Sequence, residues 1–91
     1  MEKFYITKGV YETLDMRIIT YIQTLIKSMD IEVDYLQVFS ISGNVLIHTQ
    51  EVPEYIKEYT LSKEYRDEKL FSIKTEEENS NYWTLMLAHE Y

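Results

Sequence analysis

Alternation of side chains over residues 35–50 sets the strongest limit on how this chain folds. Apolar and polar residues exchange places along the segment on both sides of Gly43-Asn44. A period of two places successive side chains on opposite faces of a β-strand. One face would carry Tyr35, Gln37, Phe39 and Ile41, and the other Leu36, Val38, Ser40 and Ser42. Because Gly-Asn suits a two-residue primed turn, the pattern predicts a hairpin in which residues 45–50 form the returning strand.

A second periodicity, of three and four residues, predicts one amphipathic helix over residues 13–29. Its apolar positions are Ile18, Ile19, Ile22, Leu25, Ile26 and Met29. Thr13 is the expected N-cap. Asp15 in the first turn and Lys27 in the last have the signs that the helix dipole favours. A helix with one apolar stripe is expected to cover a core.

The remaining strands are predicted from shorter runs. Residues 4–7, ended by Gly9, and residues 70–75 have the composition of strands. Residues 54–61 suit either a helix that begins at Pro53 or a strand whose turn is at residues 66–68. Residues 76–81 are expected to form a loop, and residues 82–88 a central strand covered on both faces.

These elements predict a fold in the α+β class, with a single domain over residues 1–91. One amphipathic helix would pack on a mostly antiparallel sheet of about five or six strands. Sequential antiparallel pairing is the simplest connection between such strands. The length of 91 residues and the 45% share of hydrophobic residues suit one domain with one core.

The net charge of the chain limits the kinds of molecule that it can be expected to bind. The chain has 16 acidic and 9 basic residues, for a net charge of −7. Direct binding to nucleic acid or to an anionic membrane needs clustered cations, so we expect neither. A basic protein is the partner that this charge favours. No apolar run approaches the roughly 20 residues that span a bilayer, and the N-terminal segment has no long apolar region, so we expect a cytoplasmic protein.

Catalytic patterns are sparse. The chain has no cysteine and only two glycines, which leaves no thiolate site and no phosphate-binding loop. A zinc site on His48 or His89 would need Glu51 or Glu90 to complete it. We expect no metal, no other cofactor and no enzymatic activity.

A hydrolase built from His48, Glu51 and a serine (Ser40 or Ser42) lacks a nucleophile elbow and an oxyanion loop. We therefore expect His48 to be a half-exposed histidine on a strand rather than a catalyst.

Acidic clusters and tyrosines are the candidate partner-binding residues. The clusters are Asp30, Glu32 and Asp34; Glu51, Glu54 and Glu58; and Glu76, Glu77 and Glu78. They are either solvated loops or one acidic face that imitates a nucleic-acid backbone. The tyrosines suit interfaces and cross-strand packing equally. The expected contact residues are Glu76, Glu77, Glu78, Glu54, Glu58, Tyr55, Tyr59 and Tyr65.

Three segments resemble a known family. They are "ITKGVYETLDMRIITYIQTLI", "IEVDYLQVFSISGNVLIHTQEVPEYIKEYTL" and "TLMLAHEY". Together they resemble a small family of unknown function from Gram-positive Firmicutes and their phages and plasmids, domain of unknown function 960. The resemblance implies an intracellular protein of a bacterium or a mobile element and favours a strand over residues 57–61. It implies no catalytic residue.

Three functions remain open. The leading expectation is a protein-interaction module that inhibits a host or defence protein that handles nucleic acid, in the manner of an anti-CRISPR protein. The first alternative is a housekeeping accessory protein that forms a homodimer through an exposed strand edge. The second is a small hydrolase that uses His48.

Overall fold

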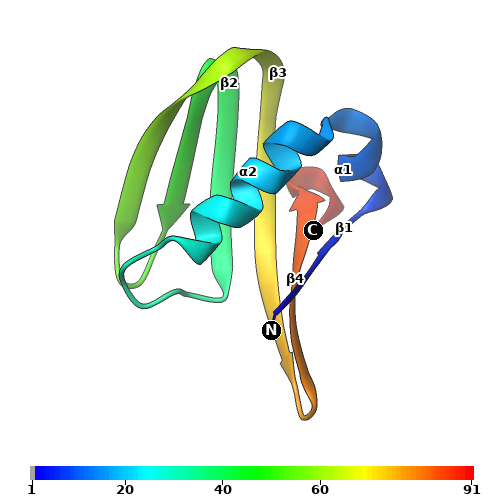
Figure 1. Ribbon diagram of the computed structural model, residues 1–91, viewed down its shortest axis with the longest axis vertical. Coiled ribbons are helices and arrows are strands. Elements are labelled where there is room, and N and C mark those ends of the chain that lie inside the picture. The colour runs from blue at the N-terminus through cyan, green and yellow to red at the C-terminus, as the bar shows by residue number, and fades with distance from the viewer. Residues whose placement is uncertain (1) are drawn as a thin grey trace.

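Strands and helices follow one another along residues 2–91, the part of the chain that the computed structural model describes. The elements are β1 (Lys3–Ile6), α1 (Lys8–Thr13), α2 (Met16–Lys27), β2 (Leu36–Gln50), β3 (Tyr55–Glu77), β4 (Ser80–Leu87) and a final 3-10 turn, η1 (Ala88–Glu90). The strand order in the sheet is β1-β4-β3-β2 (Figure 1). β1 runs parallel to β4, and the other neighbours are antiparallel. The fold class is thus α+β, as predicted, with a mixed but mostly antiparallel sheet.

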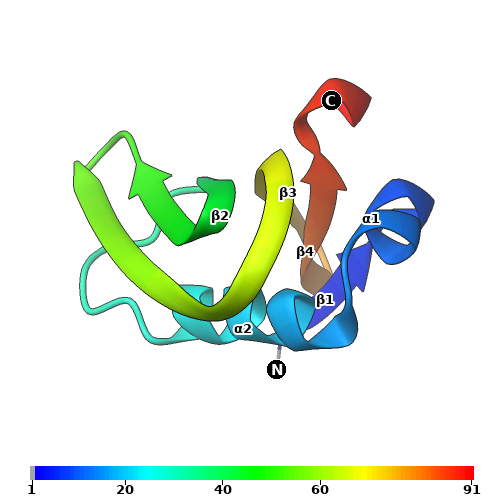
Figure 2. The ribbon, with the colours of Figure 1, turned by 90° about the horizontal axis from the view of Figure 1, so that it is seen from above.

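β2 and β3 form one long ribbon that bends back on itself at Gly43. Residues 36–41 of β2 pair with residues 68–73 of β3, and residues 45–50 pair with residues 55–60. The register shifts on both sides of Gly43, whose φ is +60°. Seen from above, β3 arches around β2, and α2 lies along the outer side of the arch (Figure 2).

The predicted hairpin turn at Gly43-Asn44 is therefore wrong. Residues 45–50 do return, but they pair with β3 rather than with the first half of β2. The turn lies at residues 51–54, where the Val52-Pro53 peptide bond is cis. A tight turn and a bulged bend both use a glycine at positive φ, so the sequence signal is the same for the two.

The number of strands is also lower than predicted, four in the described residues instead of five or six. β3 continues through residues 66–68, which were expected to form a turn. Of the two alternatives for residues 54–61, the structure shows the strand, which begins at Tyr55. The predicted loop at residues 76–81 shrinks to a two-residue turn at 78–79. Long strands replace short ones because β2 and β3 pair on both sides of the bend, with register shifts at Gly43.

Two helices replace the single one predicted. Thr7 caps α1, accepting a hydrogen bond from Val10 N, and Asp15 caps α2, accepting one from Ile18 N at 3.1 Å. Thr13, the predicted N-cap, instead ends α1, and Gly9 lies inside α1 rather than ending a strand. Threonine and aspartate are both good N-caps, so the pattern alone did not choose between them.

The helices cover only one face of the sheet. The core on that face contains Val10, Leu14, Ile18, Ile19, Ile22, Leu25, Ile26, Phe39, Ile41, Leu46, Leu70, Trp83, Leu85 and Leu87. β4 is central, as predicted, but Tyr82, Thr84 and Met86 on its other face are only half-buried. The prediction that both of its faces are covered is therefore wrong, and an apolar sheet face remains open.

Candidate interaction surface

Three polar side chains lie on the buried face of the β2–β3 ribbon. Gln37 comes from the first half of β2, and His48 and Gln50 come from the second half. All three occupy the inward positions of the alternating pattern, beside Phe39 and Leu46. Buried polar groups of this kind are stable only when they are hydrogen-bonded to one another or to the backbone.

His48 is completely buried, so the expectation of a half-exposed histidine is wrong. Its ring stacks on Phe39 at a centroid distance of 4.3 Å and meets Tyr55 edge-on at 5.1 Å. The prediction failed because the Gly43 bend brings the two halves of β2 together, and the alternation alone does not reveal this. Full burial denies a substrate access to the ring.

The hydrogen bonds determine the tautomer of His48. Gln37 Nε2 donates to the carbonyl of Asp34 at 2.9 Å and to Gln50 Oε1 at 2.7 Å, so Gln37 Oε1 faces His48. His48 Nε2, 2.7 Å from that oxygen, must donate the proton. Nδ1 is then the bare nitrogen and has no partner within residues 2–91. Burial lowers the pKa of His48 to about 4, because a second proton would place a charge where no acceptor exists.

Gln50 connects this network to two acidic segments. Its Oε1 accepts a hydrogen bond from Asp34 N at 2.7 Å, and its Nε2 donates to the carbonyls of Glu32 at 3.0 Å and Pro53 at 2.8 Å. One side chain therefore fixes the segment before β2 against the turn that follows it. As a result, acidic clusters that are distant in sequence lie side by side.

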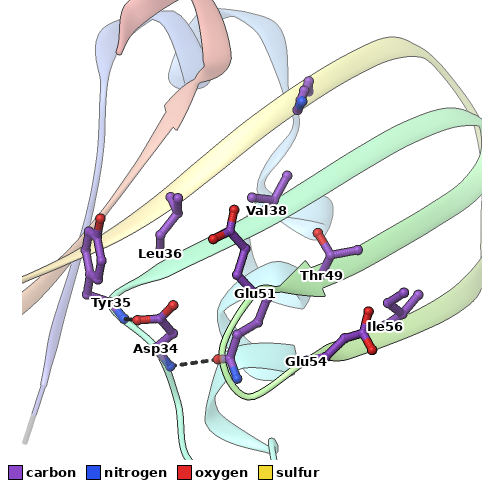
Figure 3. A pocket seen from close by; sticks show the side chains of 10 residues that line it. Asp34, Tyr35, Leu36, Val38, Thr49, Glu51, Glu54 and Ile56 are labelled. Atoms are coloured by element: carbon purple, nitrogen blue, oxygen red, sulfur yellow. Dashed lines mark hydrogen bonds between the residues drawn. The ribbon is translucent and has the colours of Figure 1, made fainter.

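The result is a groove of about 450 Å³ on the face of the ribbon away from α2 (Figure 3). Leu36, Val38 and Ile56 provide apolar walls, with Thr49 between the two halves. The carboxylates are those of Asp34, Glu51 and Glu54, and Lys69 is the one cation among the lining residues. In Figure 3, Glu51 reaches toward Leu36 and Val38, and Glu54 lies beside Ile56.

The predicted tyrosines contribute more to the core than to the surface. Tyr55 is only 9% exposed. Tyr59 packs edge-on against Tyr21 at 6.0 Å, and the hydroxyl of Tyr65 donates to Asp15 Oδ2 at 3.4 Å. All three come from β3, but each is at least half-buried within the structure.

The predicted acidic residues fall into separate places. Glu76, Glu77 and Glu78 lie at the tip of the β3–β4 hairpin, where Glu2, Glu77 and Glu78 border a shallow hollow. The turn that carries Glu54 lies at another corner of the molecule (Figure 1). Glu58 is exposed on β3 and pairs with Ile47. The structure does not bring the expected contact residues together on one face.

Sequence reasoning missed the residues that organise the groove, above all Gln37 and Gln50. A signal existed, because both glutamines fall on the inward side of the alternation, where apolar residues are usual. Asp34 was noted as part of an acidic cluster but was not expected to meet Glu51 and Glu54.

The described residues contain neither a metal-binding cluster nor a helix that could cross a membrane. Within residues 2–91, no group of three or more histidine or carboxylate side chains is arranged to hold a metal ion. None of the helices in the same range has the length and apolar character that crossing a membrane requires.

Comparisons with protein-family models, with curated proteins and with solved structures find no match to this chain. The resemblance to domain of unknown function 960 therefore stays a prediction.

Proposed function

We propose that this protein is an acidic interaction module that binds a basic protein. In the sharper form, the partner handles nucleic acid, for example a CRISPR nuclease, and the module competes with nucleic acid for a cationic surface. The observation that carries the proposal is the convergence of Asp34, Glu51 and Glu54 around one groove with a single lysine. The Gln50 hydrogen bonds fix the backbone of Asp34 against the turn that carries Glu51 and Glu54, so that three carboxylates border the same groove.

The overall charge supports the same reading. A net charge of −7 on 91 residues accelerates the encounter with a cationic partner and opposes binding to phosphate backbones. The resemblance to a family of Gram-positive bacteria and their mobile elements implies that such a partner lies in a bacterial cytoplasm.

The hydrolase alternative has less support, because His48 is inaccessible and its Nε2 is engaged by Gln37. The homodimer alternative rests on the open sheet face and on the outer edges of β1 and β2, the end strands of the sheet. Sedimentation velocity over a range of concentrations separates it from the leading proposal.

Capture from a Gram-positive lysate on the immobilised protein tests the proposed function. We expect a basic nucleic-acid-handling protein to be retained at low salt and released as salt rises, because screening weakens charge-driven contacts. The captured protein should then lose affinity for its nucleic acid when the module is added. If no basic protein is retained at low salt, the proposal fails.

Charge-reversed variants locate the contact. The tip of the β3–β4 hairpin is tested by a triple variant, Glu76→Lys, Glu77→Lys and Glu78→Lys. The groove is tested by a double variant, Glu51→Lys and Glu54→Lys. Glu64→Lys with Asp67→Lys is the matched control, because both residues are exposed on β3 away from either place. Equal losses for all three sets would indicate an effect of net charge and no defined contact.

A further inference from the structure

The open face of the β2–β3 ribbon is apolar, yet the helices leave it uncovered. Its half-buried side chains come from both halves of β2, from the second half of β3 and from β4. They include Leu36, Val38, Val45, Ile47, Phe71 and Met86. Tyr91 covers Phe71 edge-on at 5.4 Å, but it does not line the groove at the other end of the face. Apolar patches of this kind mark contact sites more often than solvated surface.

The groove combines that apolar surface with a negative rim. Leu36 and Val38 lie on one wall, and the 65% exposed side chain of Ile56 lies on the other. The carboxylates of Asp34, Glu51 and Glu54 border the groove at separate points, while Lys69 is the sole counter-charge among the lining residues. An occupant must therefore supply apolar side chains for the walls and cations for the rim.

We propose that this groove is the docking site for an amphipathic, basic segment of a partner protein, with leucine-like side chains on one face and lysine or arginine along its border. The inference rests on the proposed function, because it names where and how a basic partner would bind. Burial of apolar surface would provide the affinity, and the carboxylates would select the sign of the charge.

Charge complementarity disfavours a second copy of this chain as the occupant. Two identical grooves would each bring three carboxylates and one lysine to the shared interface. Symmetric association would thus bury like charges together. Nucleic acid is disfavoured for the same reason, since its phosphates would meet the same carboxylates.

The groove is also preformed, which lowers the cost of binding. The Asp34 amide is held by Gln50 Oε1, and the turn is held through the carbonyl of Pro53. Asp34 Oδ1 in turn accepts a hydrogen bond from Tyr35 N at 2.8 Å. A segment that docks here would not need to order the rim first.

A synthetic 18-residue helical peptide of leucine and lysine is a suitable probe. The controls are a peptide of the same composition with the apolar face scrambled and a peptide with glutamate in place of lysine. We expect amide chemical-shift changes on peptide addition to cluster at residues 34–38, 49–51 and 54–56. The scrambled and acidic peptides should bind at least tenfold more weakly by fluorescence anisotropy.

Substitution at the wall provides the decisive comparison. Ile56→Lys is expected to weaken binding of the leucine–lysine peptide at least tenfold. Val52→Lys is the matched control, because Val52 is an exposed β-branched residue of the turn before β3 and does not line the groove, and it should change affinity less than threefold. Equal effects of the two variants, or shifts centred on residues 76–81, would overturn the inference. So would a dimer of the free protein that Ile56→Lys abolishes.

These outcomes can be told apart from failure of the proposed function. A basic protein captured from lysate could bind the Ile56→Lys variant as well as the unmodified chain, yet fail to bind the triple Glu76–Glu78 variant. In that case the proposed function stands, and the assignment of the groove as the docking site is wrong. If the peptide maps to the groove but lysates yield no basic partner, the groove stands and the proposed function fails.

Discussion

His48 donates its Nε2 proton to Gln37 Oε1 across 2.7 Å, and both side chains are completely shielded from solvent. The contact joins the two halves of β2 on the buried face of the ribbon. It depends on a neutral imidazole, because protonated Nδ1 would be a buried donor without an acceptor. Stability should therefore depend on pH in a way that a single residue controls.

The free energy of unfolding should fall as the pH is lowered from about 6.5 to about 4. Burial lowers the folded-state pKa of His48 to about 4, whereas the unfolded chain takes up the proton near 6.5. In that window the unfolded state binds more protons, so acid favours unfolding. The loss should approach about 3 kcal/mol, since each pKa unit corresponds to about 1.4 kcal/mol.

Urea denaturation at several pH values measures this dependence. His48→Gln retains an amide donor toward Gln37 but does not titrate, so its stability should vary much less between pH 4 and 6.5. His89→Gln, at an exposed histidine, should leave the slope intact. An unchanged slope in the His48 variant would assign the pH dependence to other groups.

Gln50→Ala should destabilise the fold by about 2–4 kcal/mol. The side chain makes four hydrogen bonds, and its removal leaves the amide of Asp34 and the carbonyl of Pro53 without partners. Hydrogen exchange should show faster exchange at Asp34, whose amide is held only by this side chain. Thr49→Ala, the neighbouring residue on the outer face, should cost less than about 1 kcal/mol. Comparable losses in the two variants would refute a special role for Gln50.

Gly9→Ala should destabilise the protein even though alanine is the better helix former. A Cβ at Gly9 would lie 2.6 Å from Glu90 Oε2, and the carboxylate would have to leave Thr7 Oγ1 and Leu87 N, its donors at 2.7 and 2.8 Å. In a Glu90→Ala background the obstacle is gone. The same Gly9→Ala change should then be neutral or stabilise by up to about 1 kcal/mol, as helix propensity predicts. The absence of this reversal in a thermal-denaturation cycle would contradict the contact.

Asp15→Ala should cost about 1–2 kcal/mol, because Asp15 caps α2. Asp15→Asn keeps an acceptor for Ile18 N but loses the ion pair with Lys63 at 2.8 Å, so it should cost less. The Lys63 ammonium and the Ile18 amide lower the pKa of Asp15. Its charge therefore stabilises the fold above the unfolded-state pKa and ceases to do so as the pH falls. An asparagine variant as unstable as the alanine variant in urea would argue against the cap.

The local patterns in the sequence predicted which face of a strand each residue occupies better than they predicted which strands pair. Alternation correctly separated Gln37 and Phe39 from Leu36 and Val38, because a strand has a period of two wherever it goes. The turn at Gly43 was wrong because pairing partners are chosen by long-range contacts that no local pattern records. His48 was misplaced for the same reason, since its burial depends on a bend that brings Phe39 against it. The groove was not predictable, because Asp34 lies beside the turn of Glu51 and Glu54 through the hydrogen bonds of Gln50, a contact between distant segments.

The parallel pairing of residues 3–6 with residues 82–85 has a consequence for biosynthesis. Residues 3–6 are synthesised before residues 82–85, so this strand must wait for nearly 80 further residues before its partner exists. Until then the inner sides of Phe4 and Ile6 have no sheet to join. Such distant closure is a late and slow event in folding. β1 therefore stays without its sheet partner until residues 82–85 have been made, and its pairing closes the sheet late in folding.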